Sequence, residues 1–171
     1  MEDVTKKTWL EVALNGPWTQ EKQARIPIKV EDIVQQGIAC VNAGAAIVHV
    51  HAYDEETGRQ KDDVDVYKKI IEGIRTEVDA IVYPTVSASG MNPIDERSTG
   101  EDRYAHIESL AKDGFLEWTV LDPGSCNFSH YDQLKEDKVG YVYQNSEADA
   151  RHGMGVAHKY GLHPSYAIYA P

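Results

Sequence analysis

The stretch Ala45-Ala46-Ile47-Val48-His49-Val50-His51-Ala52 decides the predicted fold, because it places two histidines at the carboxyl end of a short apolar run. The run is too short and too continuously apolar to be anything but a strand buried on both faces. Strand side chains alternate between faces, so His49 and His51 are expected to project to the same side. Neutral imidazole is the commonest metal ligand, and strand ends carry the chemistry of parallel-sheet and barrel enzymes. The stretch therefore predicts a buried strand that ends in a candidate metal pair.

Along the rest of the chain, strand-like runs alternate with helical patterns. Strand-like runs are expected at residues 8–14, 45–52, 80–86, 115–121 and 166–169. Apolar residues recur at helical spacing within residues 30–43, 65–77, 101–112 and 146–160. Strands that alternate with helices predict an α/β fold with a parallel sheet and right-handed crossovers. We expect a single domain over residues 1–171.

Two architectures suit this alternation, a doubly wound open sheet and an eight-stranded barrel. The turn after the first strand, residues 15–18, lacks the G-x-G-x-x-G spacing of a dinucleotide-binding sheet. Polar residues instead follow every strand, at Asn15, at the histidine pair, at residues 85–90 and at residues 122–127. In a barrel those ends converge on one mouth. The prediction is a (β/α)8 TIM-barrel type fold, here an incomplete barrel of about five parallel strands with four crossover helices.

Composition narrows the classes of partner. The 171 residues include 17 basic and 28 acidic side chains, for a net charge of -11. An acidic surface repels phosphate backbones, so no nucleic-acid partner is expected. No run approaches the roughly 20 apolar residues of a membrane span, and the first ten residues are too polar for a signal peptide. We expect a cytoplasmic protein with no membrane partner.

Several blocks of this chain together resemble one enzyme family. The blocks are residues 14–19, 38–52, 56–59, 122–128 and 163–166. In this order they are similar to the beta-keto acid cleavage enzymes, and the long block that ends in His49-Val50-His51 is the specific part. The similarity covers nearly the whole chain. It implies that the sequence is the N-terminal half of a TIM barrel, because a complete barrel typically needs about 250 residues.

The resemblance implies a zinc-dependent enzyme that takes a small-molecule β-keto acid and acetyl-CoA and returns acetoacetate and a new acyl-CoA. His49 and His51 match the family's two histidine ligands of Zn²⁺. The family's third ligand is a glutamate far downstream, next to an aspartate thought to act as general base. Neither position exists in this chain. The metal would act as a Lewis acid on the keto oxygen.

Three further residues match the family less closely. Thr85 and Ser87 fall in the segment that holds the substrate carboxylate, although the usual T-G-G order is absent. Asp122, the candidate catalytic residue, follows the fourth strand and could hydrogen-bond the substrate or a ligand of the metal. Each has an alternative. Thr85 and Ser87 could cap the next helix, and Asp122 could belong to a simple turn.

Alternatives to this function also stay open. On spacing alone, His49 and His51 are as well explained as core histidines with other hydrogen-bond partners. A metal-dependent amidohydrolase-like hydrolase is disfavoured. That class places His-x-His on the first barrel strand, whereas here a strand and a helix precede the motif. A catalytically inactive half-barrel or interaction module remains, since an open barrel edge invites pairing. For the same reason a homo-oligomer is expected.

Overall fold

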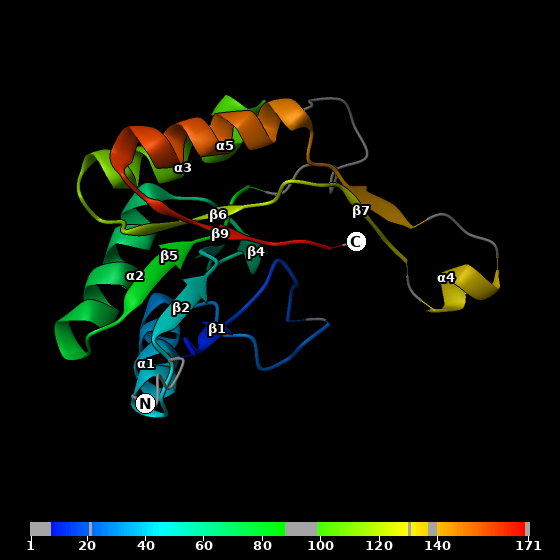
Figure 1. Ribbon diagram of the computed structural model, residues 1–171. Coiled ribbons are helices and arrows are strands. Elements are labelled where there is room, and N and C mark those ends of the chain that lie inside the picture. Colours follow the sequence, from blue (N-terminus) through cyan, green and yellow to red (C-terminus); the bar gives the residue numbers. More distant parts are fainter. Residues whose placement is uncertain (1–7, 21, 88–98, 130, 137–139, 170–171) are drawn as a thin grey trace, which may run out of the picture. The chain divides into compact units, whose positions relative to one another are not determined.

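The computed structural model describes residues 8–20, 22–87, 99–129, 131–136 and 140–169 (Figure 1). Two compact units divide the chain, Met1–Pro84 and Thr85–Pro171, and each is described by itself. The single domain expected over residues 1–171 stays a prediction. In the described part, no helix combines the length and the apolar character needed to cross a membrane.

A parallel sheet of three strands forms the centre of the first unit. Its strands are β1 (Glu11–Ala13), β2 (Ile47–Val50) and β5 (Ile81–Pro84), in the order β1-β2-β5. In this register His49 lies between Ala13 and Tyr83. Val48 and Val50 are fully buried, as expected for a central strand covered on both faces. The sheet therefore places the carboxyl end of the histidine strand between two neighbours.

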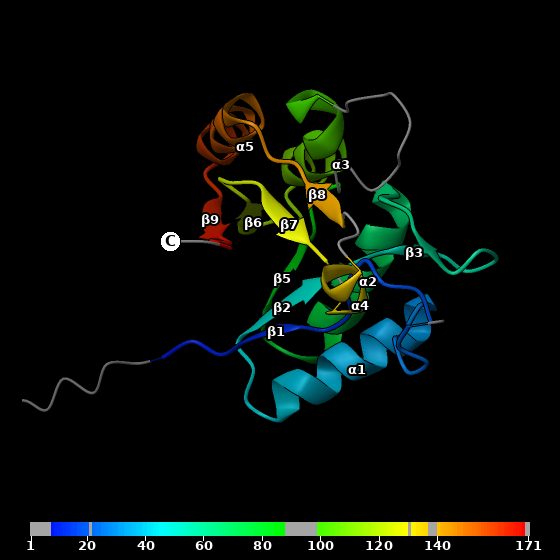
Figure 2. The same cartoon turned by 90° about the vertical axis from the view of Figure 1, so that its right-hand side faces the viewer.

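Helices α1 (Val30–Asn42) and α2 (Val64–Glu77) connect these strands and pack on each other and on the sheet (Figure 2). Two glycines make their close approach possible. A Cβ on Gly37 would lie 2.6 Å from Ile74, and one on Gly73 would lie 2.8 Å from Val34. Asp63 begins α2, because its side chain accepts hydrogen bonds from two backbone N–H groups of the first turn.

A short hairpin lies between β2 and α2. It pairs β3 (Tyr53–Asp54) with β4 (Arg59–Gln60), so that Tyr53 lies opposite Gln60. The Asp54 carboxylate closes the turn by accepting from the N–H groups of Glu56 and Thr57. Gly58 has a φ of 65°, a left-handed conformation that favours glycine. This turn returns the chain toward the end of the histidine strand.

The second unit repeats the strand–helix–strand pattern. Strands β6 (Trp118–Leu121) and β9 (His163–Tyr166) pair in parallel, and helices α3 (Gly100–Lys112) and α5 (Glu147–Tyr160) pack on each other. Both helices begin with a capping box, Thr99 with Asp102 and Ser146 with Asp149. The capping box at Ser146 confirms the start predicted for the last helix.

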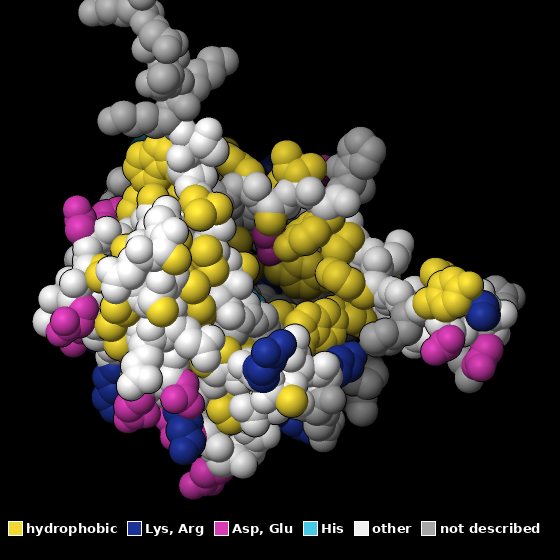
Figure 3. Space-filling model, turned by 90° about the horizontal axis from the view of Figure 1, so that it is seen from below, with side chains coloured by type: hydrophobic (Ala, Val, Ile, Leu, Met, Phe, Trp, Pro, Cys, Tyr) yellow, Lys and Arg dark blue, Asp and Glu magenta, His cyan; other side chains and the backbone are white. Residues whose placement is uncertain are grey.

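A second hairpin extends from this unit. It pairs β7 (Cys126–Phe128) with β8 (Tyr141–Tyr143), and the short helix α4 (Tyr131–Lys135) lies between them. Helix α4 lies at the right of Figure 1, and the corresponding part of Figure 3 shows apolar and charged side chains. Tyr131 and Leu134 are exposed there.

Three parallel strands in the first unit and two in the second alternate with four long helices, in agreement with the sequence prediction, and the fold is mixed α/β. Their continuation into part of a barrel stays a prediction. The expected strand at residues 166–169 is wrong, because the strand is His163–Tyr166. Its pairing with β6 sets this register, and an edge strand tolerates Pro164 despite the missing N–H. The first strand is also shorter than the expected residues 8–14.

Candidate active site

The two histidines of the predicted metal pair lie together. His49 is in β2 and His51 follows its end, and their ring centroids are 5.2 Å apart at an interplanar angle of 84°. The ring of Tyr83, the neighbour of His49 on β5, lies 4.9 Å from the His49 ring. The alternation of the strand thus brings both imidazoles to one side. Their role as ligands stays a prediction.

Asn15 holds the backbone at this strand end. Its side chain accepts from the N–H of His51 at 2.8 Å and donates to the carbonyl oxygen of the same residue at 3.1 Å. It also donates to the carbonyl oxygen of Pro27 at 3.2 Å. Asn15 is buried and follows β1, so two adjacent strand ends are tied together. Backbone groups that no ladder pairs are satisfied in this way.

The side chain of His51 is held by the first hairpin. Its Nδ1 lies 2.9 Å from Oε1 of Gln60, the last residue of β4. Gln60 donates in turn to the Asp62 carboxylate, at 3.1 Å. Burial lowers the pKa of His51, and the Gln60 hydrogen bond and the charge of Asp62 oppose that shift. The neutral imidazole is therefore favoured.

His49 differs from its neighbour in having an unpartnered nitrogen. Its Nδ1 is buried and has no hydrogen-bond partner among the residues that the structure describes. Burial, together with the charge that His51 would carry, lowers the pKa of His49 to about 3. A neutral imidazole with an unsatisfied buried nitrogen costs stability unless a ligand completes it.

These features test whether the pair suits zinc. Zn²⁺ binds neutral imidazole nitrogen, and a catalytic zinc site typically uses three protein ligands. The pair fits two of those positions, because both rings are neutral, adjacent and directed to one side of the sheet. Over the described ranges, no group of three or more His, Cys, Asp or Glu side chains is arranged to hold a metal ion.

Thr85 and Ser87, the predicted carboxylate-binding residues, both lie in the second unit. Thr85 is buried, and its carbonyl oxygen lies 2.7 Å from Nε2 of His106. The carbonyl oxygen of Ser87 accepts from Nε of Arg103 at 2.8 Å. Neither residue caps the next helix, because Thr99 is the N-cap of α3. The capping alternative is therefore wrong, and residues 88–90 of this segment lie outside the described residues.

Asp122, the predicted catalytic residue, follows β6 and is 5% exposed. Tyr143 donates to its Oδ2 at 2.5 Å, and Tyr169 lies 3.5 Å from its Oδ1. Burial raises the pKa of Asp122, against the opposing effects of Tyr143, Arg103 and Tyr169. The role of Asp122 as a catalytic residue stays a prediction.

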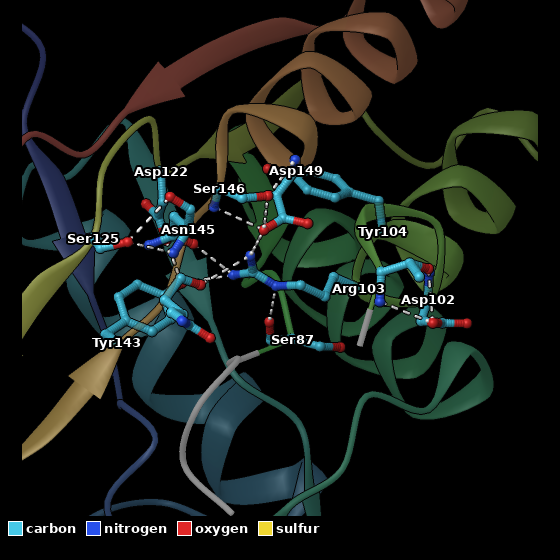
Figure 4. Close-up of polar contacts among 12 residues, drawn as sticks. Ser87, Asp102, Arg103, Tyr104, Asp122, Ser125, Tyr143, Asn145, Ser146 and Asp149 are labelled. Carbon is cyan, nitrogen blue, oxygen red and sulfur yellow. Dashed lines mark hydrogen bonds and ion pairs between the residues drawn. The ribbon is translucent and has the colours of Figure 1, made fainter. Parts of the chain in front are cut away.

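The guanidinium of Arg103, on α3, organises the segments around Asp122 (Figure 4). The side chain is 1% exposed. Its Nη2 donates to Asn145 at 2.7 Å and to the Tyr143 hydroxyl at 3.3 Å, and its Nη1 lies 3.3 Å from the Asp149 carboxylate. Nε and Nη1 also donate to backbone carbonyl oxygens. Each arm of the guanidinium is thus partnered, as a buried charge requires.

Sequence reasoning found the histidine pair but missed the residues that hold it. The run of charges Lys61-Asp62-Asp63 predicts a solvated loop, whereas Asp62 accepts hydrogen bonds from Gln60 and from the buried Tyr67. Arg103 also went unnoticed. It lies four and seven residues before Ile107 and Leu110, on the buried face of α3, and this spacing was the available signal.

Comparison with known proteins agrees with the sequence blocks. The model of the family described as beta-keto acid cleavage enzyme matches residues 7–171. A 3-dehydrocarnitine:acetyl-CoA trimethylamine transferase of Rhizobium meliloti is 28% identical over 141 residues, which are 74% of this chain and 46% of that protein. A 3-keto-5-aminohexanoate cleavage enzyme of Fusobacterium nucleatum is 31% identical over 112 residues, 64% of this chain and 36% of that protein.

A solved structure supports the fold. The ternary complex of ObcA with C4-CoA adduct and oxalate superposes with a TM-score of 0.65 at 21% identity, over 84% of this chain and 31% of that chain. This chain spans less than half the length of each of these proteins. Because the family model matches nearly all of it, the chain belongs to the beta-keto acid cleavage enzyme family.

Proposed function

We propose that this chain forms part of a zinc-dependent enzyme that cleaves a β-keto acid with acetyl-CoA. The products are acetoacetate and a new acyl-CoA, so the acyl group of the keto acid passes to CoA and its acetate portion receives the acetyl group. Membership of the family and the acetyl-CoA in the name of the R. meliloti relative support this reaction class. The observation that carries the proposal is the neutral His49–His51 pair with an unpartnered buried nitrogen.

His49 and His51 would hold the zinc ion. When bound, Zn²⁺ supplies Lewis-acid chemistry that stabilises negative charge on the keto oxygen. The protein keeps both imidazoles neutral by burial, so that they do not have to lose a proton before they bind a cation. Asn15 and Gln60 orient His51 through its backbone and its ring. A third protein ligand and the general base would come from the part of a complete barrel that this chain does not contain.

Other residues would handle the organic substrate. Thr85 and Ser87 would bind its carboxylate through their hydroxyl groups. Asp122 would hydrogen-bond the substrate, and burial raises its pKa above the ordinary value. Tyr143 orients the Asp122 carboxylate. In this proposal residues 1–171 form the N-terminal portion of a TIM barrel in a cytoplasmic homo-oligomer.

The test is product formation. Zinc-loaded protein, with this chain completed by the remainder of its barrel, is incubated with acetyl-CoA and a panel of β-keto acids, and acetoacetate and acyl-CoA are measured by mass spectrometry. We expect both products from at least one keto acid. Loss of both in His49→Ala, with retention in the exposed-histidine control His158→Ala, would assign the reaction to the pair. Stoichiometric zinc without products from any keto acid in this completed protein contradicts the proposal and favours a catalytically inactive protein.

A further inference from the structure

A chain of side-chain hydrogen bonds runs from α2 to the ring of His51. Tyr67, fully buried on α2, donates to Oδ1 of Asp62 at 2.9 Å. Gln60 donates to the same carboxylate through Nε2, at 3.1 Å to Oδ1 and 3.4 Å to Oδ2. Its Oε1 lies 2.9 Å from Nδ1 of His51. None of these three residues belongs to the predicted metal pair.

The donors and acceptors in this chain have a direction. A carboxylate only accepts hydrogen bonds, so Asp62 requires the NH₂ group of the Gln60 amide to face it. The amide oxygen must then face His51. An oxygen accepts, so Nδ1 of His51 has to carry the proton. The reversed amide would set its oxygen against the Asp62 carboxylate, and both would then lack a proton to share.

We infer that Gln60, anchored by Asp62, is a positioning residue that fixes His51 in the Nδ1–H tautomer and leaves the Nε2 lone pair for a ligand. This inference deepens the proposed function, since it names the residues that prepare one of the two zinc ligands. The second ring nitrogen of a metal-binding histidine usually donates to an oxygen that sets its tautomer and orientation. A side-chain amide performs that task here.

The β3–β4 hairpin explains how the side-chain amide of Gln60 reaches the ring of His51. Gln60 lies opposite Tyr53 in the β3–β4 pair, and the Lys61 N–H donates to the Ala52 carbonyl oxygen at 2.9 Å. The chain directly after β4 is therefore tied to the residue that follows His51. Tyr67 then fixes Asp62 from the buried face of α2. Each end of the relay is attached to regular structure, so the amide has little freedom to turn.

The direct test is the tautomer of His51 in the metal-free protein. Long-range ¹H–¹⁵N correlation spectra distinguish a protonated ring nitrogen from one with a lone pair. We expect wild-type His51 to carry its proton on Nδ1, and Gln60→Leu to lose that preference. Arg59→Gln, an exposed change in the same strand, is the control and should retain it. A wild-type proton on Nε2, or an unchanged Nδ1–H in Gln60→Leu, overturns the inference.

A double variant tests the direction of the relay. In Gln60→Glu with Asp62→Asn, a carboxylate faces His51 and an amide NH₂ donates to it, so Nδ1–H is again required. The double variant should restore the tautomer, whereas Asp62→Asn alone should weaken the preference, because an amide partner accepts either orientation of Gln60. A purely steric role for Gln60 predicts no such rescue. Failure of the rescue in a folded double variant contradicts the relay.

Zinc affinity supplies a second readout. Gln60→Leu should lower it by about 10- to 100-fold in competition with a chromophoric chelator, the usual effect of losing such a partner. Arg59→Gln should leave it unchanged, and equal affinity in Gln60→Leu contradicts the inference. The tautomer is measured without metal, CoA or keto acid. An Nδ1–H tautomer that depends on Gln60, in a protein that forms no acetoacetate, therefore supports the relay and contradicts only the proposed reaction.

Discussion

The histidine pair of the first unit and the Arg103 cluster of the second are both buried and polar, but they differ in how fully they are satisfied. Arg103 has a partner for each arm of its guanidinium, from Asn145, Asp149, Tyr143 and backbone carbonyl oxygens. His49 has a buried Nδ1 without a partner in the described residues. A satisfied network is complete as a structural element, whereas an unsatisfied one leaves a position that a ligand can complete.

An unpartnered nitrogen is not sufficient by itself. Nε2 of His152 on α5 is also buried without a partner in the described part of the chain. His152 packs near the ring of Tyr104, at 6.0 Å between centroids, whereas His49 packs against a second imidazole. The combination of an unsatisfied nitrogen with a neighbouring neutral ligand distinguishes the candidate metal site.

The largest predicted effect removes the centre of the satisfied cluster. Arg103→Met removes the ion pair of Asp149 and the buried donor to Asn145 and two backbone carbonyl oxygens. It should lower the free energy of unfolding by about 3–5 kcal/mol. Chemical denaturation measures it. Arg151→Met is the control, because Arg151 is 79% exposed and forms an exposed ion pair with Glu147. It should change stability by less than about 1 kcal/mol. Equal effects for the two variants would show that burial of Arg103 has no energetic consequence.

The next effect tests the packing behind Asp122. A Cβ on Gly153 would lie 2.5 Å from Tyr104 and 2.7 Å from Leu121, the residue before Asp122. Gly153→Ala should therefore cost about 1–3 kcal/mol of stability. Gly155→Ala, in the same helix with open space at its Cβ, should stabilise by about 0.5–1 kcal/mol. Thermal unfolding of both variants checks this pair, and matching signs would contradict it.

The unsatisfied site should respond in the opposite way. His49→Leu removes a buried nitrogen that has no partner in the described residues, and should stabilise the metal-free protein by about 1 kcal/mol. His51→Leu should destabilise the metal-free protein, because Oε1 of Gln60 loses its hydrogen-bond partner. Denaturation in the presence of a chelator measures both. If His49→Leu lost as much stability as His51→Leu, the hydrogen bonding of the two histidine side chains would not differ as described.

The smallest effect is a pH dependence within the second unit. Burial raises the pKa of Asp122, so the folded state binds this proton more tightly than the unfolded state. Its ionisation therefore costs stability as the pH rises above about 3.9. The pKa of Asp149 is lowered: burial alone would raise it, but hydrogen bonds from Ser146 and the charge of Arg103 outweigh burial. Ionised Asp149 stabilises the fold at neutral pH and loses that contribution in acid.

Two isosteric variants separate these contributions. Between about pH 3 and about pH 7, the stability of wild type relative to Asp122→Asn should fall, and that relative to Asp149→Asn should rise. Urea denaturation at several pH values gives both differences. The same slope for both variants would contradict the opposite pKa shifts.

The parallel strands and long helices were predictable because they carry periodic apolar patterns. The two hairpins were not, because their strands are too short to show a periodicity. Strands β3 and β4 have two residues each, and β7 and β8 have three each. The last strand was misplaced because His163 and Pro164 resemble a loop, and pairing with β6 decides its position.

The candidate site shows the same division. Spacing along one strand was enough to find His49 and His51. The link from Asp62 through Gln60 to His51 joins a loop, a hairpin and a strand end, and only the folded chain brings these together. Asp62 could not be distinguished from its solvated neighbours in the sequence, because its partner Tyr67 lies on the following helix.

Zinc titration tests the central claim, that the His49–His51 pair is a metal site, most directly. Metal-free wild type, His49→Ala and His158→Ala are titrated with Zn²⁺ against a chromophoric chelator, with folding checked by circular dichroism. We predict one zinc bound per chain in wild type and in His158→Ala, and loss of that binding in His49→Ala. Equal zinc binding in wild type and a folded His49→Ala would contradict the account.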